Sequence, residues 1–223
     1  FWISRVPLKN RFRPGDQAND NLNDENNKNF CWMAPTGEMS KKWGALPRYN
    51  FDADNFNMWQ YVDIHSNWTN GFWRVPGAFN DVAHKNGVKT GCTYFIDWGA
   101  GVNQMEEPGK TLYELATPGT NSYGDKYKYS RKLIQFLKYY GIDGLCFNPE
   151  GYWGYTVYSR FIPFLAECHK IAKELNHPFH VDWYAFVSNT GALSDNGCKL
   201  TTQNNNWFHH AATNQPVTDV FFL

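Results

Sequence analysis

The sequence predicts an α/β fold with a parallel sheet, best matched by a (β/α)8 barrel of the TIM type, of which about six β/α units are present. Short apolar runs alternate with stretches of helical periodicity, which is the pattern of strand–helix–strand units. These runs are nearly continuous in apolar residues, as in strands covered on both faces. Polar and aromatic residues cluster just after several strands, where a barrel places its active site. An open doubly wound sheet is the alternative, but no glycine-rich phosphate loop follows any of these runs.

Six apolar runs are the predicted strands of the sheet. In chain order they are residues 30–35, 59–65, 88–98, 142–148, 178–186 and 217–223. A closed barrel needs two further units after the last of these strands. We therefore expect a polar N-terminal lead-in over residues 1–29 and a catalytic barrel over residues 30–223 that is incomplete at its C-terminus.

The first predicted helix begins near Pro76, which suits a first helical turn, and ends at Gly87, which suits the position after the last turn. Phe79, Val82 and Ala83 share one face of this helix and are expected to pack on the sheet.

Two more helices are predicted between the later strands. The first covers residues 125–141, with Asp125 at its start and Gly141 at its end. Its apolar stripe consists of Leu133, Ile134, Phe136, Leu137 and Tyr140. The second lies within residues 160–177 and starts near Pro163.

The balance of charge argues against nucleic acid or an anionic membrane as a partner. The chain of 223 residues has 21 Lys and Arg against 21 Asp and Glu, so its formal net charge at pH 7 is zero. Nucleic acids and anionic membranes bind proteins that have an excess of positive charge, and this chain has none. No stretch approaches the roughly 20 apolar residues of a membrane span, and the first residues lack the pattern of a signal peptide. Oligomeric state stays open.

The cysteines predict free thiols rather than a disulfide framework. There are five, an odd number, and no C-x-x-C pair occurs. Cys31, Cys92 and Cys146 fall inside apolar runs, where small buried thiols are expected. His209 and His210 are adjacent, and adjacent residues rarely ligate one ion, so we expect no metal and no cofactor.

Aromatic residues make up 18% of the chain, and many of them stand beside Asn, Asp or Gly. Cores prefer Leu, Ile and Val, whereas rings at loop edges suit flat ligands such as sugars. The alternative is that these rings pack a large core. His65, at the end of the second predicted strand, has the same two interpretations: it faces the mouth of the barrel and binds substrate, or it belongs to the core.

The segment YYGIDGLCFNPEGYWG, residues 139–154, carries the candidate chemistry. Asn148 and Glu150 are two residues apart at the end of a buried strand, so they point the same way, into the mouth of a barrel. Glycoside hydrolysis normally uses two carboxyl groups. One carboxyl group beside a carboxamide suits a variant in which the 2-acetamido group of the sugar attacks its own anomeric carbon and forms an oxazoline. A turn cap and a solvated glutamate are the alternative.

Four segments resemble glycoside hydrolase family 85, the endo-β-N-acetylglucosaminidases, over roughly residues 59–223. YGIDGLCFNPEG is similar to that family's catalytic strand with its N-x-E motif. HKNGVKTGCTYFIDW is similar to the third-strand segment that ends in an acid and Trp. WYAFV and DVFFL are similar to the fifth and sixth strands.

The resemblance implies a retaining enzyme that cuts the GlcNAc-β-1,4-GlcNAc core of N-linked glycans. Glu150 would be the acid/base, Asn148 would orient the acetamido group, and Tyr184 would hydrogen-bond near the reacting centre. The residues expected to bind substrate are Asp97, Trp98, Tyr152, Trp153, Trp183 and His65. Bacterial members of such a family are usually exported, which favours a secreted, periplasmic or cell-surface location over the cytoplasm.

Two alternatives for the function remain. Family 18 chitinases and endoglycosidases carry D-G-x-D-x-D-x-E on the equivalent strand, and Asp143, Gly144 and Glu150 match it. Cys146 and Asn148 stand where two of its aspartates belong, which favours family 85. The other alternative is a barrel that binds carbohydrate without catalysis.

Overall fold

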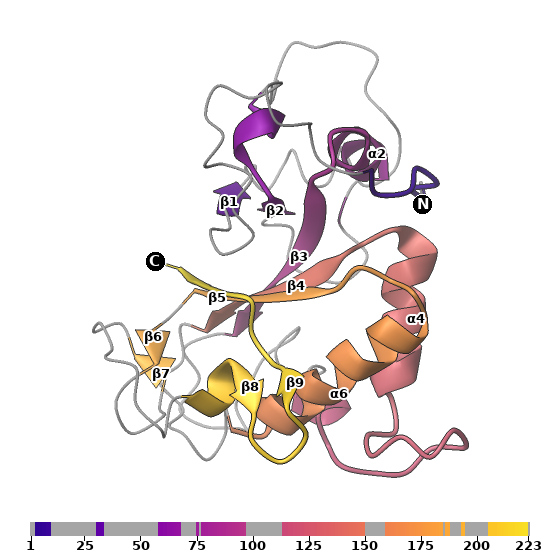
Figure 1. Ribbon diagram of the computed structural model, residues 1–223, viewed down its shortest axis with the longest axis vertical. Helices are drawn as coiled ribbons and strands as arrows, with labels where there is room; N and C mark the ends of the chain where they lie inside the picture. Colours follow the sequence, from indigo (N-terminus) through magenta and orange to yellow (C-terminus); the bar gives the residue numbers. More distant parts are fainter. Residues whose placement is uncertain are drawn as a thin grey trace. The chain divides into compact units, whose positions relative to one another are not determined.

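The computed structural model describes residues 3–9, 30–33, 58–67, 75, 77–96, 113–149, 159–184, 186–187, 193–194 and 205–222. One sheet contains six strands in the order β1-β2-β3-β4-β5-β10 (Figure 1). Their bounds are Phe30–Met33 for β1, Ile64–Asn67 for β2, Lys89–Ile96 for β3, Gly144–Pro149 for β4, His180–Tyr184 for β5 and Val220–Phe222 for β10. The pairs β1–β2, β2–β3 and β5–β10 are parallel. Neighbours in the sheet follow the chain, as in a barrel built from successive β/α units.

Among the described residues, three α-helices lie between these strands in the chain, and two short hairpins follow β5. The helices are α2 (Gly77–Lys85), α4 (Ser130–Tyr140) and α6 (Phe161–Glu174). Strands β6 (Phe186–Val187) and β7 (Leu193–Ser194) form one antiparallel pair, and β8 (His209–His210) and β9 (Gln215–Pro216) form the other. The described residues also form two 3-10 turns, η2 (Trp59–Tyr61) and η4 (Asn205–Trp207). The predicted strand over residues 59–65 therefore begins as a 3-10 turn, and only its end belongs to β2.

The chain divides into two compact units. Unit 1 is Phe1–Thr93 with Leu137–Gly144, and unit 2 is Tyr94–Phe136 with Leu145–Leu223. The division runs through β3, α4 and β4 rather than through a linker. Neither unit is a contiguous segment of the chain.

All three α-helices end in the same backbone motif, with a left-handed residue after the last turn. That residue is Gly87 after α2, Gly141 after α4 and Asn176 after α6, and each has a positive φ. After α4, Gly141 N–H donates to Lys138 O at 3.3 Å and Ile142 N–H donates to Leu137 O at 2.9 Å. The glycine stops predicted at positions 87 and 141 are confirmed. Helix α4 itself starts at Ser130, five residues later than predicted.

Unit 1 has a small core in which α2 packs against η2. Trp59, Val62, Ala83 and Val88 are buried together, with Phe79 against them. The predicted packing face of α2 is wrong at Val82, which is 44% exposed, while Asn80 and His84 are buried. The helix is thus rotated so that polar side chains lie inside, because His84 has a hydrogen-bonding partner there.

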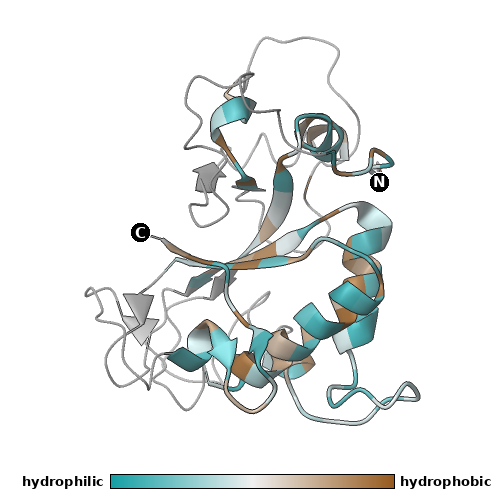
Figure 2. Ribbon diagram, in the orientation of Figure 1, coloured by the Kyte–Doolittle hydropathy of each residue, from teal (hydrophilic) through white to brown (hydrophobic). Residues whose placement is uncertain are grey.

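Unit 2 is held by an aromatic core and by two amphipathic helices. In Figure 2, α4 changes from hydrophobic to hydrophilic around its axis, and its Leu133 and Ile134 are buried. Helix α6 buries residues on most of its length, among them Phe161, Phe164 and Leu165. This apolar surface explains why the 14-residue helix needs no side-chain cap at its start.

Candidate active site

The carboxyl ends of β4 and β5 carry two of the predicted catalytic residues. Phe147 stacks on Trp183 with ring centroids 4.2 Å apart and planes at 20°. Both rings also approach Phe161 of α6, at 6.1 and 6.0 Å, so they lie on the helix-facing side of the sheet. Because successive side chains of a strand alternate, Asn148 and Tyr184 point to the opposite side. That side is the interior of a barrel, where the sequence predicts the site.

Asn148 is the last but one residue of β4 and is only 1% exposed. Its carboxamide offers an acceptor and two donors, the set needed to hold a second amide in one orientation. Pro149 ends the strand, as expected for a residue without an N–H. Glu150 lies outside the described residues, so the joint orientation of Asn148 and Glu150 stays a prediction. Asp97, Trp98, Tyr152 and Trp153 also lie outside the described residues.

Trp183 and Tyr184 have different surroundings although they are neighbours in β5. Trp183 is fully buried and also meets Trp207 edge-on at 5.3 Å. This packing does not support the predicted contact of Trp183 with substrate, because the ring lies on the helix-facing side without exposed surface. Tyr184 is half-buried at the last position of β5, opposite Phe222 in the register. Its hydrogen bond near the reacting centre stays a prediction.

A buried contact between a histidine and an aspartate, which the sequence did not predict, lies on β5. His180 Nδ1 and Asp182 Oδ2 are 2.8 Å apart, and both side chains are fully buried. They alternate with Val181 and Trp183, so they share the inner side of the strand with Tyr184. The signal was available in the sequence as polar residues at alternate positions of an otherwise apolar strand.

His65 in unit 1 is fully buried among aromatic rings. Its ring lies 4.6 Å from that of Phe79 and 5.8 Å from that of Trp59. Burial lowers the pKa of His65 to about 4, so the imidazole is neutral at pH 7. Of the two interpretations made from the sequence, these contacts favour the core histidine. Substrate contact by His65 stays untested.

Asp143, which matches the family 18 motif, is held by hydrogen bonds within unit 1. His84 Nε2 lies 2.7 Å from Asp143 Oδ2, and the backbone N–H of Thr90 donates to the same oxygen at 2.8 Å. The group precedes β4, at the amino end of the strand. Residues at that end of a barrel strand support the fold, whereas chemistry belongs to the carboxyl end.

The described part of the chain contains three buried cysteines. Cys92, Cys146 and Cys168 are free and buried, as predicted for the first two. Burial raises the pKa of Cys92 and Cys168. Within the described ranges, no group of three His, Cys, Asp or Glu side chains could hold a metal ion. No helix among these residues is long and apolar enough to span a membrane.

Comparison with known proteins gives a family and several similar solved structures. The family model described as Glycosyl hydrolase family 85 matches residues 37–223. The glycoside hydrolase domain of Endo-D from Streptococcus pneumoniae R6 superposes with a TM-score of 0.61 at 20% identity, over 99% of this chain and 33% of that chain. A chitinase from Rhizomucor miehei has a TM-score of 0.46 at 13% identity, over 88% of this chain and 56% of that one. The comparison with curated proteins gave no match.

The likeness to the Endo-D domain confirms the predicted fold class, a partial (β/α)8 barrel. The resemblance to family 85 inferred from four short segments is confirmed by the match over residues 37–223. The chain spans about a third of the Endo-D chain that it matches.

Proposed function

Because the chain belongs to glycosyl hydrolase family 85, we propose that it is an endo-β-N-acetylglucosaminidase acting on the GlcNAc-β-1,4-GlcNAc core of N-linked glycans. The observation that carries this proposal is the position of Asn148: a buried carboxamide at the carboxyl end of β4, on the side of the strand that faces away from α6. In the N-x-E motif the acid/base follows two residues later. The chain's many aromatic residues suit a carbohydrate substrate.

The proposed reaction has two steps and retains the anomeric configuration. In the first step the acetamido oxygen of the substrate attacks its anomeric carbon, and Glu150 protonates the leaving glycosidic oxygen as that bond breaks. Asn148 accepts a hydrogen bond from the acetamido N–H and so stabilises the positive charge of the oxazolinium ion. In the second step the Glu150 carboxylate takes a proton from water, which attacks the same carbon and opens the ring. Tyr184 is proposed to hydrogen-bond beside the reacting carbon.

The test uses release of the glycan from a high-mannose glycopeptide, measured by mass spectrometry. Glu150→Gln should lower the rate by at least about 10²-fold, since a positioned general acid/base contributes about 10²–10⁴-fold. Asn148→Ala should lose hydrolysis of the glycopeptide yet keep some turnover of a preformed sugar oxazoline, because the first step is then bypassed. Near wild-type rates in Glu150→Gln would refute the assignment.

The control is Glu114→Gln, which removes a carboxyl group from an exposed position in unit 2. It should keep the wild-type rate. Wild-type protein that binds the glycopeptide without releasing glycan would support the alternative of a non-catalytic carbohydrate-binding barrel. Export to the cell surface, the periplasm or the medium stays a prediction.

A further inference from the structure

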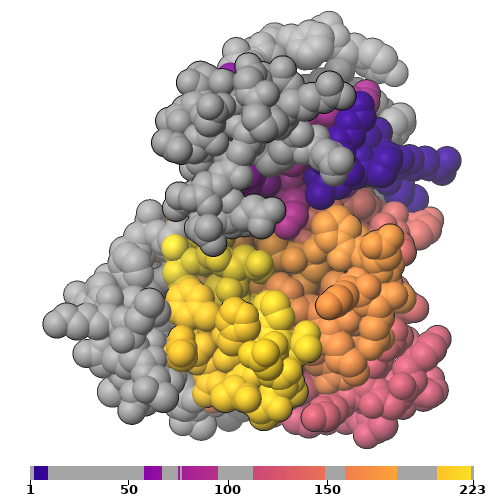
Figure 3. All heavy atoms as spheres, viewed as in Figure 1, coloured from indigo at the N-terminus to yellow at the C-terminus, as the bar shows by residue number. Residues whose placement is uncertain are grey.

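Unit 2 contains a cavity that the proposed reaction does not use. Its volume is about 190 Å³, and it lies among the loop before α4, the helix α6 and the β8–β9 hairpin. Its polar lining comes mainly from Lys126, Tyr127, Glu167, Lys170 and Gln215, and Pro163 and Ala166 add apolar surface. Figure 3 shows the C-terminal segment that includes β8 and β9 lying directly against the segment that includes α6.

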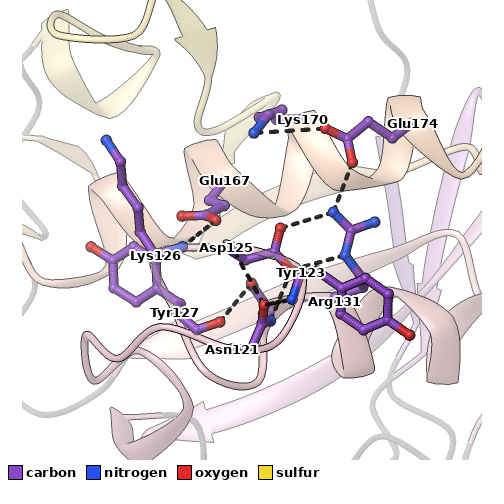
Figure 4. Close-up of polar contacts among 10 residues, drawn as sticks. Asn121, Tyr123, Asp125, Lys126, Tyr127, Arg131, Glu167, Lys170 and Glu174 are labelled. Carbon is purple, nitrogen blue, oxygen red and sulfur yellow. Dashed lines mark hydrogen bonds and ion pairs between the residues drawn. The ribbon is translucent and has the colours of Figure 1, made fainter.

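One wall of the cavity is a loop held rigidly by a charged network (Figure 4). The guanidinium of Arg131 donates to both carboxylate oxygens of Asp125 at 2.8 Å and to Glu174 of α6 at 2.8 Å. Asn121 accepts the backbone N–H of Tyr123 and donates to Asp125. Arg131 holds the pKa of Asp125 below its usual value, so the network is intact at neutral pH. The loop residues that line the cavity therefore have fixed positions.

Glu167 is the buried polar group of this cavity. It is 8% exposed, and one carboxylate oxygen accepts the backbone N–H of Lys126 at 2.6 Å. Burial, followed by the nearby charge of Asp125, raises the pKa of this carboxyl group. Tyr127 and Glu167 both line the cavity, and burial followed by the charge of Glu167 raises the pKa of Tyr127. A carboxylate oxygen and a phenol hydroxyl thus face the same small space.

Several groups around this space have unused hydrogen-bonding capacity. Among the described residues, the structure shows no hydrogen bond from the Tyr127 hydroxyl, the Lys126 ammonium or the Gln215 carboxamide. Tyr127 can donate, Lys126 can donate, and Gln215 can do both. Lys170 lies 3.6 Å from Glu174, which partly offsets its charge.

The opposite charges of Glu167 and Lys126 in the cavity lining favour a neutral ligand over an ionic one. An anion would bring a like charge against the buried carboxylate of Glu167, and a cation would meet Lys126. Hydroxyl groups both donate and accept, so they can bind the carboxylate, the ammonium and the carboxamide together. The apolar edges of Pro163 and Ala166 suit the C–H groups of a ring.

We propose that this cavity is a second carbohydrate-binding site, which takes one neutral sugar ring and lies apart from the residues of the catalytic motif. The choice of sugar rests on the proposed function, since mannose and N-acetylglucosamine are the units of its substrate. The site would hold part of a glycan without cutting it.

The experiment is an NMR titration of the isotope-labelled chain carrying Glu150→Gln, so that no turnover interferes. The probes are methyl α-mannoside, N-acetylglucosamine and, as the anionic sugar, N-acetylneuraminic acid. The backbone amides of Lys126, Ala166 and Thr213 should shift and saturate with at least one neutral sugar and not with the anionic one. Tyr127→Phe and Gln215→Ala should each weaken that binding about tenfold, as expected for one lost hydrogen bond of about 1.4 kcal/mol.

Tyr129→Phe is the matched control, because Tyr129 is 37% exposed and is outside the cavity lining. It should bind like the parent chain. The proposal is overturned if these amides do not shift with either neutral sugar, if Tyr127→Phe binds equally well, or if only the anionic sugar binds. If the amides shift saturably but the wild-type chain releases no glycan, the proposed function alone is refuted. If the wild-type chain releases glycan but the amides do not shift, this second site alone is refuted.

Discussion

His84 is held between two acceptors, and this fixes its charge. Its Nε2 lies 2.7 Å from the Asp143 carboxylate, and its Nδ1 lies 2.5 Å from the backbone carbonyl oxygen of Val6. A neutral imidazole has one N–H and can satisfy only one acceptor. Burial lowers the pKa of His84, but the hydrogen bond and the charge of Asp143 outweigh burial and raise it overall. The charged histidine thus links α2 to the segment of residues 3–9.

This geometry predicts stability that declines as pH rises. An unfolded histidine titrates near pH 6.5, and folding raises the pKa of His84, so its contribution is complete below about pH 6.5 and is lost as pH rises through the folded value. Urea unfolding between pH 6 and 9 should show this decline in wild type. His84→Gln should be less stable at pH 6 and should have a flatter profile.

The control for His84 is His209→Gln, which changes an exposed histidine of β8. It should keep the wild-type pH profile. The groups that raise the pKa of His84 are Asp143, the backbone carbonyl of Val6 and Asp81, and of these only the two aspartates carry charge. An unchanged decline in His84→Gln would show that another group causes it.

At the scale of the element, the end of α4 depends on a glycine for two separate reasons. Gly141 has φ +71°, and a Cβ at this position would lie 2.7 Å from Ser4 Cβ. Gly124 has φ +80° with nothing within 4 Å of such a Cβ. Gly124→Ala should therefore cost only the backbone strain, about 1 kcal/mol. Gly141→Ala should cost at least about 1 kcal/mol more in the free energy of unfolding, because Ser4 must move.

A double variant identifies the source of the extra loss at Gly141. Ser4→Gly removes the side chain that the new Cβ would meet, together with the 2.7 Å hydrogen bond from Ser4 to Asp81. The loss in the double variant should be smaller than the sum of the two single losses, as for residues in direct contact. Equal losses in Gly141→Ala and Gly124→Ala would mean that residues 3–9 do not pack on α4.

The sequence predicted most of the helices and strands, but it did not predict which face of α2 is buried or at which residue α4 begins. Helix ends were predicted well because glycine at positive φ is a local property. The face of α2 was not, because the burial of His84 depends on Asp143, which is 59 positions away in the chain. The start of α4 was placed too early because Asp125 suggested a helix cap, whereas its side chain pairs with Arg131. Long-range polar contacts leave no periodic signal in the sequence.

The same distinction applies to the candidate site. The positions of Asn148 and Tyr184 at the ends of β4 and β5 could be predicted because strand alternation is a local property, while their catalytic roles stay a prediction. The packing of Trp183 could not be predicted, because its neighbours Phe147, Phe161 and Trp207 are distant in the sequence. The His180–Asp182 pair was missed because the strand was treated as uniformly apolar.

At the scale of the whole molecule, the division into two units predicts one unfolding transition. Strands β3 and β4 and helix α4 each contribute residues to both units, so neither unit can lose its structure without breaking an element of the other. Cys92 belongs to unit 1, and Cys146 and Cys168 belong to unit 2, and all three are buried. In increasing urea, a thiol reagent should label Cys92 and Cys168 at the same rate, as measured by mass spectrometry.

Labelling of Cys168 in Cys92→Ser protein, and of Cys92 in Cys168→Ser protein, serves as the control. The labelling rate of each remaining thiol should depend on urea as it does in the wild type, after correction for the stability that the substitution removes. Labelling of one thiol at a lower urea concentration than the other would show that the units unfold separately.

The alternation along β5 has a consequence for protein engineering. Trp183 packs against Phe161 of α6 and the buried Val181 shares its side of the strand, while His180, Asp182 and Tyr184 supply polar groups on the other side. A mutant library confined to the three polar positions would alter the chemistry lining the barrel and leave the hydrophobic scaffold as it is. One five-residue strand thus separates what can be redesigned from what must be retained.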